Sequence, residues 1–427
     1  MVLVIHLQWR VVIMFKKNLC TGVIAIILIS FFSVSVVAQA ATDEFTWTSR
    51  TSAADNTWTG VAYGNGVFVA VATNETGNGV MTSPDGIVWT ARTPPSDQNW
   101  KSIVYADGIF VAVATYRGVG GGSNIIMKSS NGITWDAVTA PANINWSFIT
   151  WGNNLFVAVD SSSSANGVMT SPDAATWTLR ATAATRGWYS VAFGNNTFVA
   201  VANNSGSDNL VMTSTDGTTW TSRVAAASNG WRAVTYGNGL FVAVSGSGVG
   251  NRVMTSPDGI TWTSRTSASD NTWNSVTYGN GVFVAVSLSG TGNRVMSSPD
   301  GITWTSRNSA VDNQWYSVTY GDGLFVAVSG FGGNGNRVMT GVYSLVTSDN
   351  SAAIAAAEAA RAAEAARKAK EQRELTEILA LIPKIGELTL SLGETTKSLY
   401  STKCVKGKTV KYVNKGSKCP KGYVKKK

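Results

Sequence analysis

Residues 253–265 read VMTSPDGITWTSR, and residues 273–286 read WNSVTYGNGVFVAV. Close copies of both segments recur along most of the chain. The tryptophan of the first segment recurs in steps of 42 residues, with one step of 46 and one of 43, at Trp47, Trp89, Trp135, Trp177, Trp220, Trp262 and Trp304. The tryptophan of the second segment recurs beside it, at Trp58, Trp100, Trp146, Trp188, Trp231, Trp273 and Trp315. A period of about 40 residues that is rich in short strand signals is typical of a repeat array.

One repeat contains four strand signals. WNSVTY at 273–278 alternates and is β-branched, which predicts a strand, and GNG then predicts a tight turn. VFVAVS is a second and more apolar strand, so we expect it to be more buried. RVMSS and ITWTSR are the third and fourth strands, joined by a PDG turn. Four antiparallel strands per repeat correspond to one blade of a β-propeller.

The strand count predicts how the ring closes. The first three strands occur seven times, but the last copy stops at residues 338–340 and continues as GVYS, without SPDGITW. The missing fourth strand, FTWTSR, stands near the start of the chain at Phe45–Arg50. We expect it to complete the last blade and to cover an open sheet edge. An open array or two smaller rings is the alternative.

These observations define a fold class and its domains. The fold is predicted to be all-β, with a seven-bladed β-propeller at 44–345 closed by the N-terminal strand. An α-helical stalk at 350–402 and a small basic Cys-pair hairpin at 403–427 follow it. The stalk is predicted from a run rich in Ala, Glu, Arg and Lys without Gly or Pro, which favours a semi-rigid helix. Residues Leu375, Ile378, Ile382, Ile385, Leu392 and Leu399 follow a 3–4 spacing that suggests a coiled-coil seam and self-association.

The first 40 residues have the features of a signal peptide. Lys16 and Lys17 precede an apolar run, and Ala38-Gln39-Ala40 is a small-x-small cleavage site. Met14 is an alternative start, and an uncleaved anchor helix is the alternative to cleavage. We therefore expect the protein to be secreted or held at the cell envelope.

The SPDGITW turn resembles the Asp-box of sialidase-type and related propellers, which also lies between the third and fourth strands of a blade. The resemblance spans residues 44–345, although Asp and Gly are adjacent here whereas the family pattern usually separates them by one residue. The corresponding residues are Asp85, Asp173, Asp216, Asp258 and Asp300, with Asn131 in one copy. A short carboxylate can accept backbone N–H groups within a turn. Because these residues repeat in nearly every blade, we expect a structural role and no metal.

The same resemblance implies an alternative function, a sialidase-like glycoside hydrolase. Such enzymes need catalytic carboxylates, and sialidases also use an Arg cluster and a Tyr nucleophile. Between residues 43 and 349 the only glutamates are Glu44 and Glu75, and the arginines mostly repeat from blade to blade. The only histidine, His6, lies in the leader. We therefore expect a non-catalytic recognition or scaffold protein without a cofactor.

One variable position in a nearly constant strand suggests a ligand site. The residue after the inner-strand tryptophan is Thr59, Lys101, Ser147, Tyr189, Arg232, Asn274 or Tyr316. We predict that these side chains surround the channel mouth, with Lys101, Tyr189, Arg232, Asn274 and Tyr316 as candidate ligand-binding residues. Tyrosine and cationic side chains suit a sugar or an anionic glycan. Neutral variation at a solvated position is the alternative, and the loop-tip residues Tyr116, Arg117, Arg186 and Phe331 carry the same ambiguity.

The last segment is strongly basic. From Lys403 to Lys427 there are ten lysines and no acidic residue. Cys404 and Cys419 are the two cysteines outside the leader, and an exported chain favours their pairing as a disulfide. Residues 350–427 resemble a Lys-rich cysteine-pair module that follows an Ala-rich helix at the C-termini of predicted exported actinobacterial proteins. We expect it to bind cell-wall glycan or another anionic envelope polymer or lipid headgroups, and we expect no nucleic-acid partner. A solvated charge run is the alternative.

Overall fold

The computed structural model describes residues 42–73, 77–115, 125–204, 206–331, 335–346 and 401–426, together with seven separate positions between 363 and 377. The chain divides into two units, residues 1–358 and residues 359–427. The predicted signal peptide, the loop-tip residues Tyr116 and Arg117, Glu75 and the predicted coiled-coil seam lie outside the described residues. Among the described residues, no helix has the length and apolar character needed to cross a bilayer.

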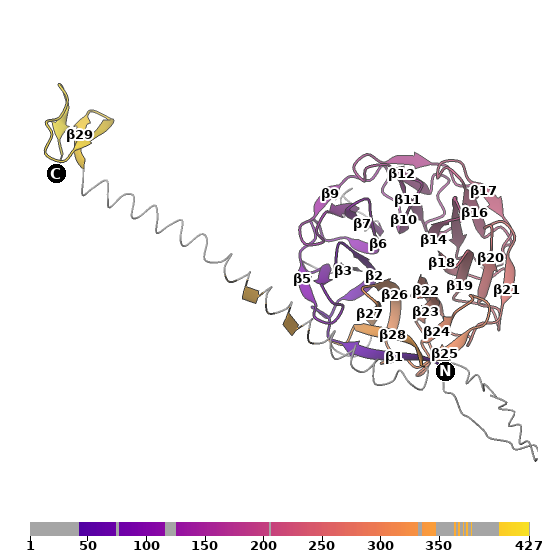
Figure 1. Ribbon diagram of the computed structural model, residues 1–427. Helices are drawn as coiled ribbons and strands as arrows, with labels where there is room; N and C mark the ends of the chain where they lie inside the picture. The colour runs from indigo at the N-terminus through magenta and orange to yellow at the C-terminus, as the bar shows by residue number, and fades with distance from the viewer. Residues whose placement is uncertain are drawn as a thin grey trace, which may run out of the picture. The chain divides into compact units, whose positions relative to one another are not determined.

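The first unit is a ring of seven four-stranded antiparallel sheets, each of which is one blade (Figure 1). Blades 1 to 6 follow chain order, from β2–β5 to β22–β25, and blade 7 has the order β1-β28-β27-β26. The innermost strands are β2 (Thr57–Gly64), β6 (Asn99–Ala106), β10 (Trp146–Gly152), β14 (Trp188–Gly194), β18 (Trp231–Gly237), β22 (Trp273–Gly279) and β26 (Gln314–Gly321).

The remaining strands of each blade lie progressively further from the centre of the ring (Figure 1). The second strands are β3 (Val67–Thr73), β7 (Ile109–Thr115), β11 (Leu155–Asp160), β15 (Thr197–Ala202), β19 (Leu240–Ser245), β23 (Val282–Ser287) and β27 (Leu324–Phe331). The third strands are β4 (Val80–Ser83), β8 (Ile126–Ser129), β12 (Val168–Ser171), β16 (Val211–Ser214), β20 (Val253–Ser256), β24 (Val295–Ser298) and β28 (Val338–Val346). The outer strands are β5 (Thr90–Arg92), β9 (Asp136–Val138), β13 (Thr178–Arg180), β17 (Thr221–Arg223), β21 (Thr263–Arg265), β25 (Thr305–Arg307) and β1 (Thr42–Arg50).

The second strands form the core, as their continuous apolar sequence predicts. In β19, for example, Phe241, Val242, Ala243 and Val244 are all fully buried. Both faces of this strand pack against apolar side chains, since neighbouring blades stack face to face around the ring. The inner-strand tryptophans, such as Trp231, are also fully buried.

The predicted closure of the ring is confirmed. Strand β1 pairs with β28 in antiparallel register, with Thr48 opposite Thr340 and Arg50 opposite Val338. Phe45 stacks on Trp47 at 5.5 Å between ring centroids and contacts Tyr343 at 5.3 Å. The N-terminal strand therefore supplies the outer edge of the last blade, and the alternatives of an open array or two smaller rings are wrong.

Aromatic side chains at the end of each inner strand join neighbouring blades. A Cβ atom placed on Gly279 would lie 2.2 Å from Cγ of Tyr320 in the next blade, so this glycine is needed for the close approach. The same contact pairs Gly64 with Tyr105, Gly152 with Phe193, Gly194 with Tyr236, Gly237 with Tyr278, and Gly321 with Tyr63. At the remaining junction Ala106 replaces the glycine. The contact of Gly321 with Tyr63 links blade 7 to blade 1 and so contributes to closure of the ring.

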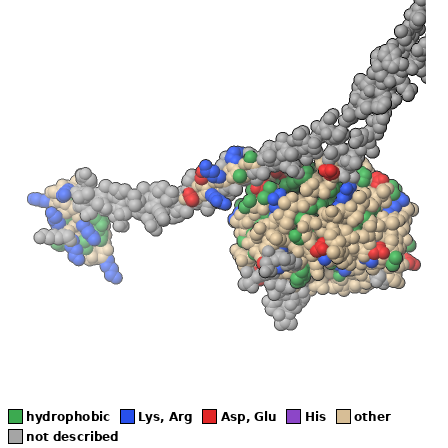
Figure 2. Space-filling view, turned by 90° about the horizontal axis from the view of Figure 1, so that it is seen from below, with side chains coloured by type: hydrophobic (Ala, Val, Ile, Leu, Met, Phe, Trp, Pro, Cys, Tyr) green, Lys and Arg blue, Asp and Glu red, His purple; other side chains and the backbone are tan. Residues whose placement is uncertain are grey.

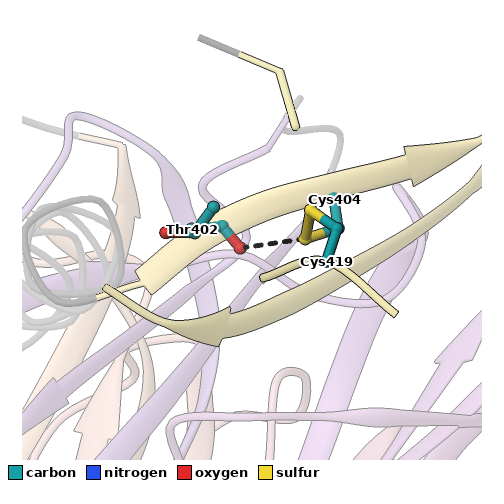
Figure 3. Close-up of a disulfide and its surroundings, with 3 residues drawn as sticks. All are labelled: Thr402, Cys404 and Cys419. Carbon is teal, nitrogen blue, oxygen red and sulfur yellow. Dashed lines mark hydrogen bonds between the residues drawn. A yellow bond between two sulfur atoms is a disulfide. The ribbon is translucent and has the colours of Figure 1, made fainter. Parts of the chain in front are cut away.

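The second unit contains a three-stranded antiparallel sheet of order β30-β29-β31, formed by β29 (Ser401–Lys406), β30 (Thr409–Asn414) and β31 (Val424–Lys425). The predicted disulfide between Cys404 and Cys419 is present, with the two Cα atoms 5.6 Å apart. Figure 3 shows this bridge, with the Cys404 sulfur 3.8 Å from the Thr402 carbonyl oxygen. The predicted hairpin thus gains a third short strand.

The predicted α-helical stalk at 350–402 is wrong as an element of this fold. Every continuous element of the described structure is a strand. In this segment the structure describes only seven separate positions, which have helical backbone and exposed side chains. Alanine and charged residues favour helical backbone locally, whereas most helical stability in proteins comes from packing an apolar face. The fold is therefore an all-β propeller followed by a small β-module.

We predict that removal of β1 destabilises the ring. A chain that starts at Thr51 exposes the edge of β28 and loses the buried face of Trp47, which favours edge-to-edge association. Loss of a large buried aromatic residue costs about 3–5 kcal/mol. We expect a lower melting temperature and aggregation relative to a chain that starts at Thr42, measured by calorimetry and size-exclusion chromatography. A synthetic peptide of residues 42–50 should restore stability, and equal behaviour of the two chains would contradict the closure.

We also predict that Gly279→Ala destabilises the propeller by about 1–3 kcal/mol, because the added methyl group overlaps the Tyr320 ring. The matched control is Ala106→Gly at the equivalent position of blade 2, where we expect a change of less than about 1 kcal/mol. Chemical denaturation measures the free energy of unfolding of both variants and of the wild type. A similar free energy of unfolding for the two variants would show that the glycine contact is unimportant.

Candidate functional site at the channel mouth

The seven inner strands enclose a central cavity of about 580 Å³. The residues that directly follow the inner-strand tryptophans all line it, and we call them the rim residues. They are Thr59, Lys101, Ser147, Tyr189, Arg232, Asn274 and Tyr316. The structure therefore brings the five candidate ligand-binding residues together around one cavity.

A β-bulge in every inner strand accounts for this placement. The pairing of β18 with β19 shifts register between Trp231 and Ala233, so that Arg232 is the extra residue. The same shift occurs after each of the other six inner-strand tryptophans. A bulge redirects a side chain, and here the tryptophan is fully buried while the next residue lines the channel. The rim residue thus varies without disturbing the core.

Three rim residues donate hydrogen bonds to a backbone carbonyl of the neighbouring blade. The Thr59 hydroxyl donates to the Trp100 carbonyl oxygen at 2.6 Å, and the Ser147 hydroxyl donates to the Trp188 carbonyl oxygen at 2.6 Å. Asn274 Nδ2 donates to the Tyr316 carbonyl oxygen at 2.7 Å. Asn274, although predicted as a ligand-binding residue, therefore already has a structural partner.

The two cationic rim residues have few partners. Arg232 donates from Nη1 to Asn274 Oδ1 at 3.0 Å, whereas its Nε is buried and has no hydrogen-bond partner in the described part of the chain. Burial lowers the pKa of the Lys101 ammonium below its ordinary value of 10.5. No Asp or Glu lines the cavity among the described residues. The channel mouth is therefore a positively charged, partly buried site.

The two tyrosines of the rim complete this surface. Tyr189 is 37% exposed. The Tyr316 ring packs against the backbone of Gly330, where an added Cβ would lie 2.8 Å from Cε2. Burial raises the pKa of Tyr316, while the charge of Arg232 acts in the opposite direction. Tyr316 therefore lies within the electrostatic reach of Arg232.

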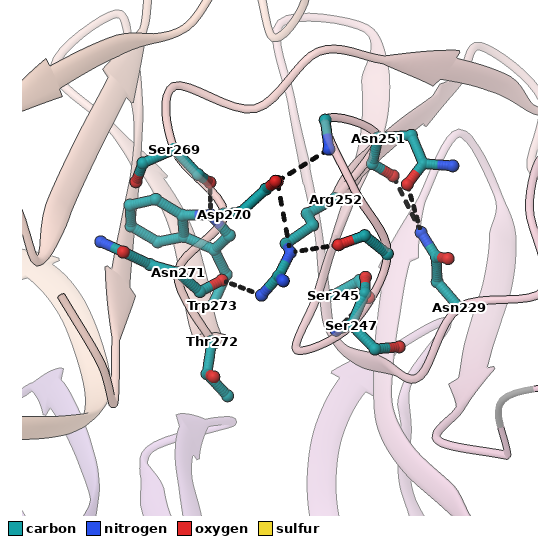
Figure 4. Close-up of polar contacts among 12 residues, drawn as sticks. Asn229, Ser245, Ser247, Asn251, Arg252, Ser269, Asp270, Asn271, Thr272 and Trp273 are labelled. Carbon is teal, nitrogen blue, oxygen red and sulfur yellow. Dashed lines mark hydrogen bonds and ion pairs between the residues drawn. The ribbon is translucent and has the colours of Figure 1, made fainter.

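The loops around this face are held by repeated polar contacts (Figure 4). Arg252 donates from Nη1 to the Asn271 carbonyl oxygen at 2.8 Å and forms an ion pair with Asp270 at 3.5 Å. Arg294 makes the equivalent contacts with Asn313 and Asp312. The loop-tip candidate Arg186 donates to the Ser207 hydroxyl at 2.7 Å, whereas Phe331 is 53% exposed. These arginines hold the loops in place. Arg186 Nε, like Arg232 Nε, is buried without a hydrogen-bond partner among the described residues.

The outer-strand arginines are structural as well. Arg265 Nε donates to the Thr255 hydroxyl at 2.9 Å on the adjacent strand. The equivalent bonds are made by Arg50, Arg92, Arg180, Arg223 and Arg307. They lie on the outer strands and not on the channel. They do not form a cluster that could bind one carboxylate.

The aspartates of the SPDG turns are engaged within their own turns. Oδ1 of Asp258 accepts the N–H groups of Ile260 and Thr261 at 2.8 and 3.0 Å, and it also accepts the Ser256 hydroxyl at 2.9 Å. The same pattern recurs at Asp85, Asp173, Asp216 and Asp300, and at Asn131. No group of three or more metal-ligating His, Cys, Asp or Glu side chains exists in the described part of the chain.

Sequence reasoning missed a second set of contacts between blades. The hydroxyl oxygens of Ser102, Ser190, Ser275 and Ser317 accept a backbone N–H from the next blade, at 3.2–3.3 Å. Each serine stands two residues after an inner-strand tryptophan. The sequence signal that could have revealed these contacts is the recurrence of serine at this position. It is interrupted by Gly60, Phe148 and Ala233 in the other three blades.

The comparisons with known proteins show the fold. No protein-family model and no curated protein matches the sequence. The structure is similar to virginiamycin B lyase from Staphylococcus aureus, with a TM-score of 0.59 at 12% identity over 70% of this chain and 99% of that chain. It is also similar to YCF48 bound to a D1 peptide, with a TM-score of 0.53 at 15% identity over 69% of this chain and 94% of that chain. Both are β-propellers, and at these identities the likeness extends to the fold alone. The comparisons do not confirm the resemblance to the Asp-box family or to the cysteine-pair module.

We predict that the turn aspartates stabilise the fold at neutral pH and that this contribution is lost in acid. The N–H of Thr176, followed by that of Ala175 and the Ser171 hydroxyl, lowers the pKa of Asp173 from 3.8 to about 2. A carboxyl with a depressed pKa stabilises the folded state above its unfolded pKa, and this contribution is lost as the pH falls through the folded value. The melting temperature of the wild type should therefore fall between about pH 4 and pH 2 more than that of Asp173→Asn. Asp136→Asn, at an exposed aspartate outside these turns, is the control, and identical pH profiles for the wild type and Asp173→Asn would contradict the assignment.

Proposed function

We propose that this chain is an exported, non-catalytic recognition protein whose propeller binds an anionic glycan at the channel mouth. The observation that carries the proposal is the pair of cationic rim residues, Lys101 and Arg232, in a cavity with no lining carboxylate among the described residues. A partly buried cation without a carboxylate partner loses part of its hydration, and an anionic ligand offsets that loss.

The tyrosines support a sugar as the uncharged part of the ligand. Tyr189 and Tyr316 line the same cavity as the two cations. An aromatic ring offers an apolar surface to the C–H face of a sugar, and its hydroxyl group can form hydrogen bonds. Uronic or sialic acid residues combine such a face with a carboxylate. The YCF48 structure with its D1 peptide is a precedent for recognition by a propeller.

The arrangement supports binding over hydrolysis. A glycosidase places two carboxylic acid groups on either side of the bond that it cleaves. The described lining of the cavity contains no such group, and the turn aspartates are engaged in their own turns. A lyase mechanism has equally little support, because a histidine-to-alanine variant of the virginiamycin B lyase is catalytically inactive and the only histidine of this chain is His6.

Export and attachment complete the proposal. The leader at residues 1–40 supports secretion, and the basic module at 403–427 supports attachment to an anionic part of the cell envelope. In this arrangement the propeller presents its channel mouth outside the cell. The module and the propeller have separate ligands, so each can be tested alone.

We predict that the mature chain, starting at Thr42, binds acidic glycans in preference to neutral ones on a glycan array. Lys101→Gln and Arg232→Gln should each weaken that binding about tenfold, since each removes one charge-assisted contact. Wild-type affinity should also fall as the pH rises through the lowered pKa of Lys101, and Lys101→Gln should lack this fall.

Lys128→Gln is the matched control, because Lys128 lies on β8 and does not line the cavity. It should leave the affinity unchanged. Equal binding of acidic and neutral glycans, or an unchanged affinity of both rim variants, would refute the proposal. Release of a shortened product from a bound glycan would favour the hydrolase instead.

A further inference from the structure

The C-terminal sheet presents an apolar face that its own residues do not cover. In its antiparallel register Val405 stands opposite Val410 and Val424, and Lys403 stands opposite Tyr412. Residues directly opposite each other in a sheet share a face, as do residues two positions apart on one strand. Val405, Val410, Tyr412 and Val424 therefore form one strip on one face of the sheet, which we call the apolar strip.

This strip is exposed. Val410 is 43% exposed, Tyr412 is 55% exposed and Val424 is 71% exposed. Among the described residues of this module only Thr402 and Cys404 are buried. A sheet of this size cannot build a hydrophobic core, and the Cys404–Cys419 disulfide restrains it instead. The apolar strip is thus not needed for a core and remains available to a partner.

The C-terminal sheet carries lysines on both of its faces. Lys403, opposite Tyr412, shares the face of the apolar strip. Residues 401–426 contain nine lysines and no Asp or Glu. Lys411 and Lys425 stand opposite Cys404, on the other face of the sheet, and Lys411 lies 5.4 Å from the ring centroid of Tyr423. Figure 2 shows lysine side chains alongside apolar ones on this module. Such a surface attracts anions and has no internal charge to oppose it.

We propose that the apolar strip, with Lys403 on the same face and the other lysines of the module nearby, forms a peripheral binding surface for an anionic lipid bilayer. The inference rests on the proposed attachment to the envelope and identifies its target. A hydrated polyanion such as a wall polymer can pair with the lysines, but it offers no apolar contact to the valines. A bilayer interface can bind both the lysines and the apolar strip. Its anionic headgroups attract the lysines, and valine and tyrosine can insert at the boundary with the acyl chains. Tyrosine suits this depth because its ring is apolar and its hydroxyl group stays hydrated.

The test is vesicle flotation of the mature full-length chain. The wild type should float with vesicles of phosphatidylglycerol and phosphatidylcholine in equal parts, and not with phosphatidylcholine alone. Val410→Ser with Val424→Ser should reduce binding to the anionic vesicles about tenfold, because the apolar contribution is lost while the charge is kept. Val224→Ser with Val249→Ser is the matched control, since these valines are 60% and 88% exposed on the propeller, and it should bind like the wild type.

A second probe separates lipid from polyanion. Dextran sulfate, a polyanion without an apolar phase, should bind the wild type and Val410→Ser with Val424→Ser equally. Lys415→Gln with Lys418→Gln should weaken binding to both vesicles and dextran sulfate. Equal flotation of the valine variant and the wild type would overturn the proposal and leave a purely electrostatic anchor. Binding to the glycan array, which reports on the propeller, should be the same for every variant, so the two proposals can fail separately.

Discussion

The antiparallel pairing of β1 with β28 is the contact on which the ring depends. Seven sheets stacked around an axis bury their cores only when the last sheet contacts the first, because an open array leaves one apolar face at each end in water. Here the last blade is built from two segments that are far apart in the sequence. Strand β1 from the N-terminal part pairs with β28 from the C-terminal part, with Arg50 opposite Val338. The Ser317 hydroxyl and the Gly321–Tyr63 contact then connect blade 7 to blade 1. The first and last blades are thus held by the same contacts that join the others.

The repeat separates structural positions from variable ones. Tryptophan, glycine and the turn aspartate recur because each makes the same structural contact in most blades. The bulge after the inner-strand tryptophan frees one position per blade from that requirement, and these seven positions meet at the channel mouth. Variation there is compatible with folding, as the range from Thr59 to Arg232 shows. Function in such a fold depends on the residues that the repeat does not specify.

Much of the fold could be predicted from the sequence, because a period of one blade fixes the strand order, the number of blades and the origin of the missing outer strand. The rim residues could also be located, since Lys101 and Arg232 differ from their counterparts at one position. The bulge was not predictable from one sequence, because it depends on how Trp231 and Ser245 pair across strands. The helical stalk was wrong because alanine content reports local preference and not packing. The apolar strip of the C-terminal module required the register of Val405 with Val410 and Val424.

Closure by β1 also fixes where the backbone enters and leaves the ring. Thr42 stands opposite Val346 at the same end of the paired strands. Neighbouring strands are about 5 Å apart, so the whole propeller begins and finishes within the width of one strand pair. A domain with such adjacent ends can be inserted into a surface loop of another protein without distorting that protein. It can also be circularly permuted at a different loop. The propeller is therefore a portable unit, which gene rearrangement can combine with other anchors without altering its architecture.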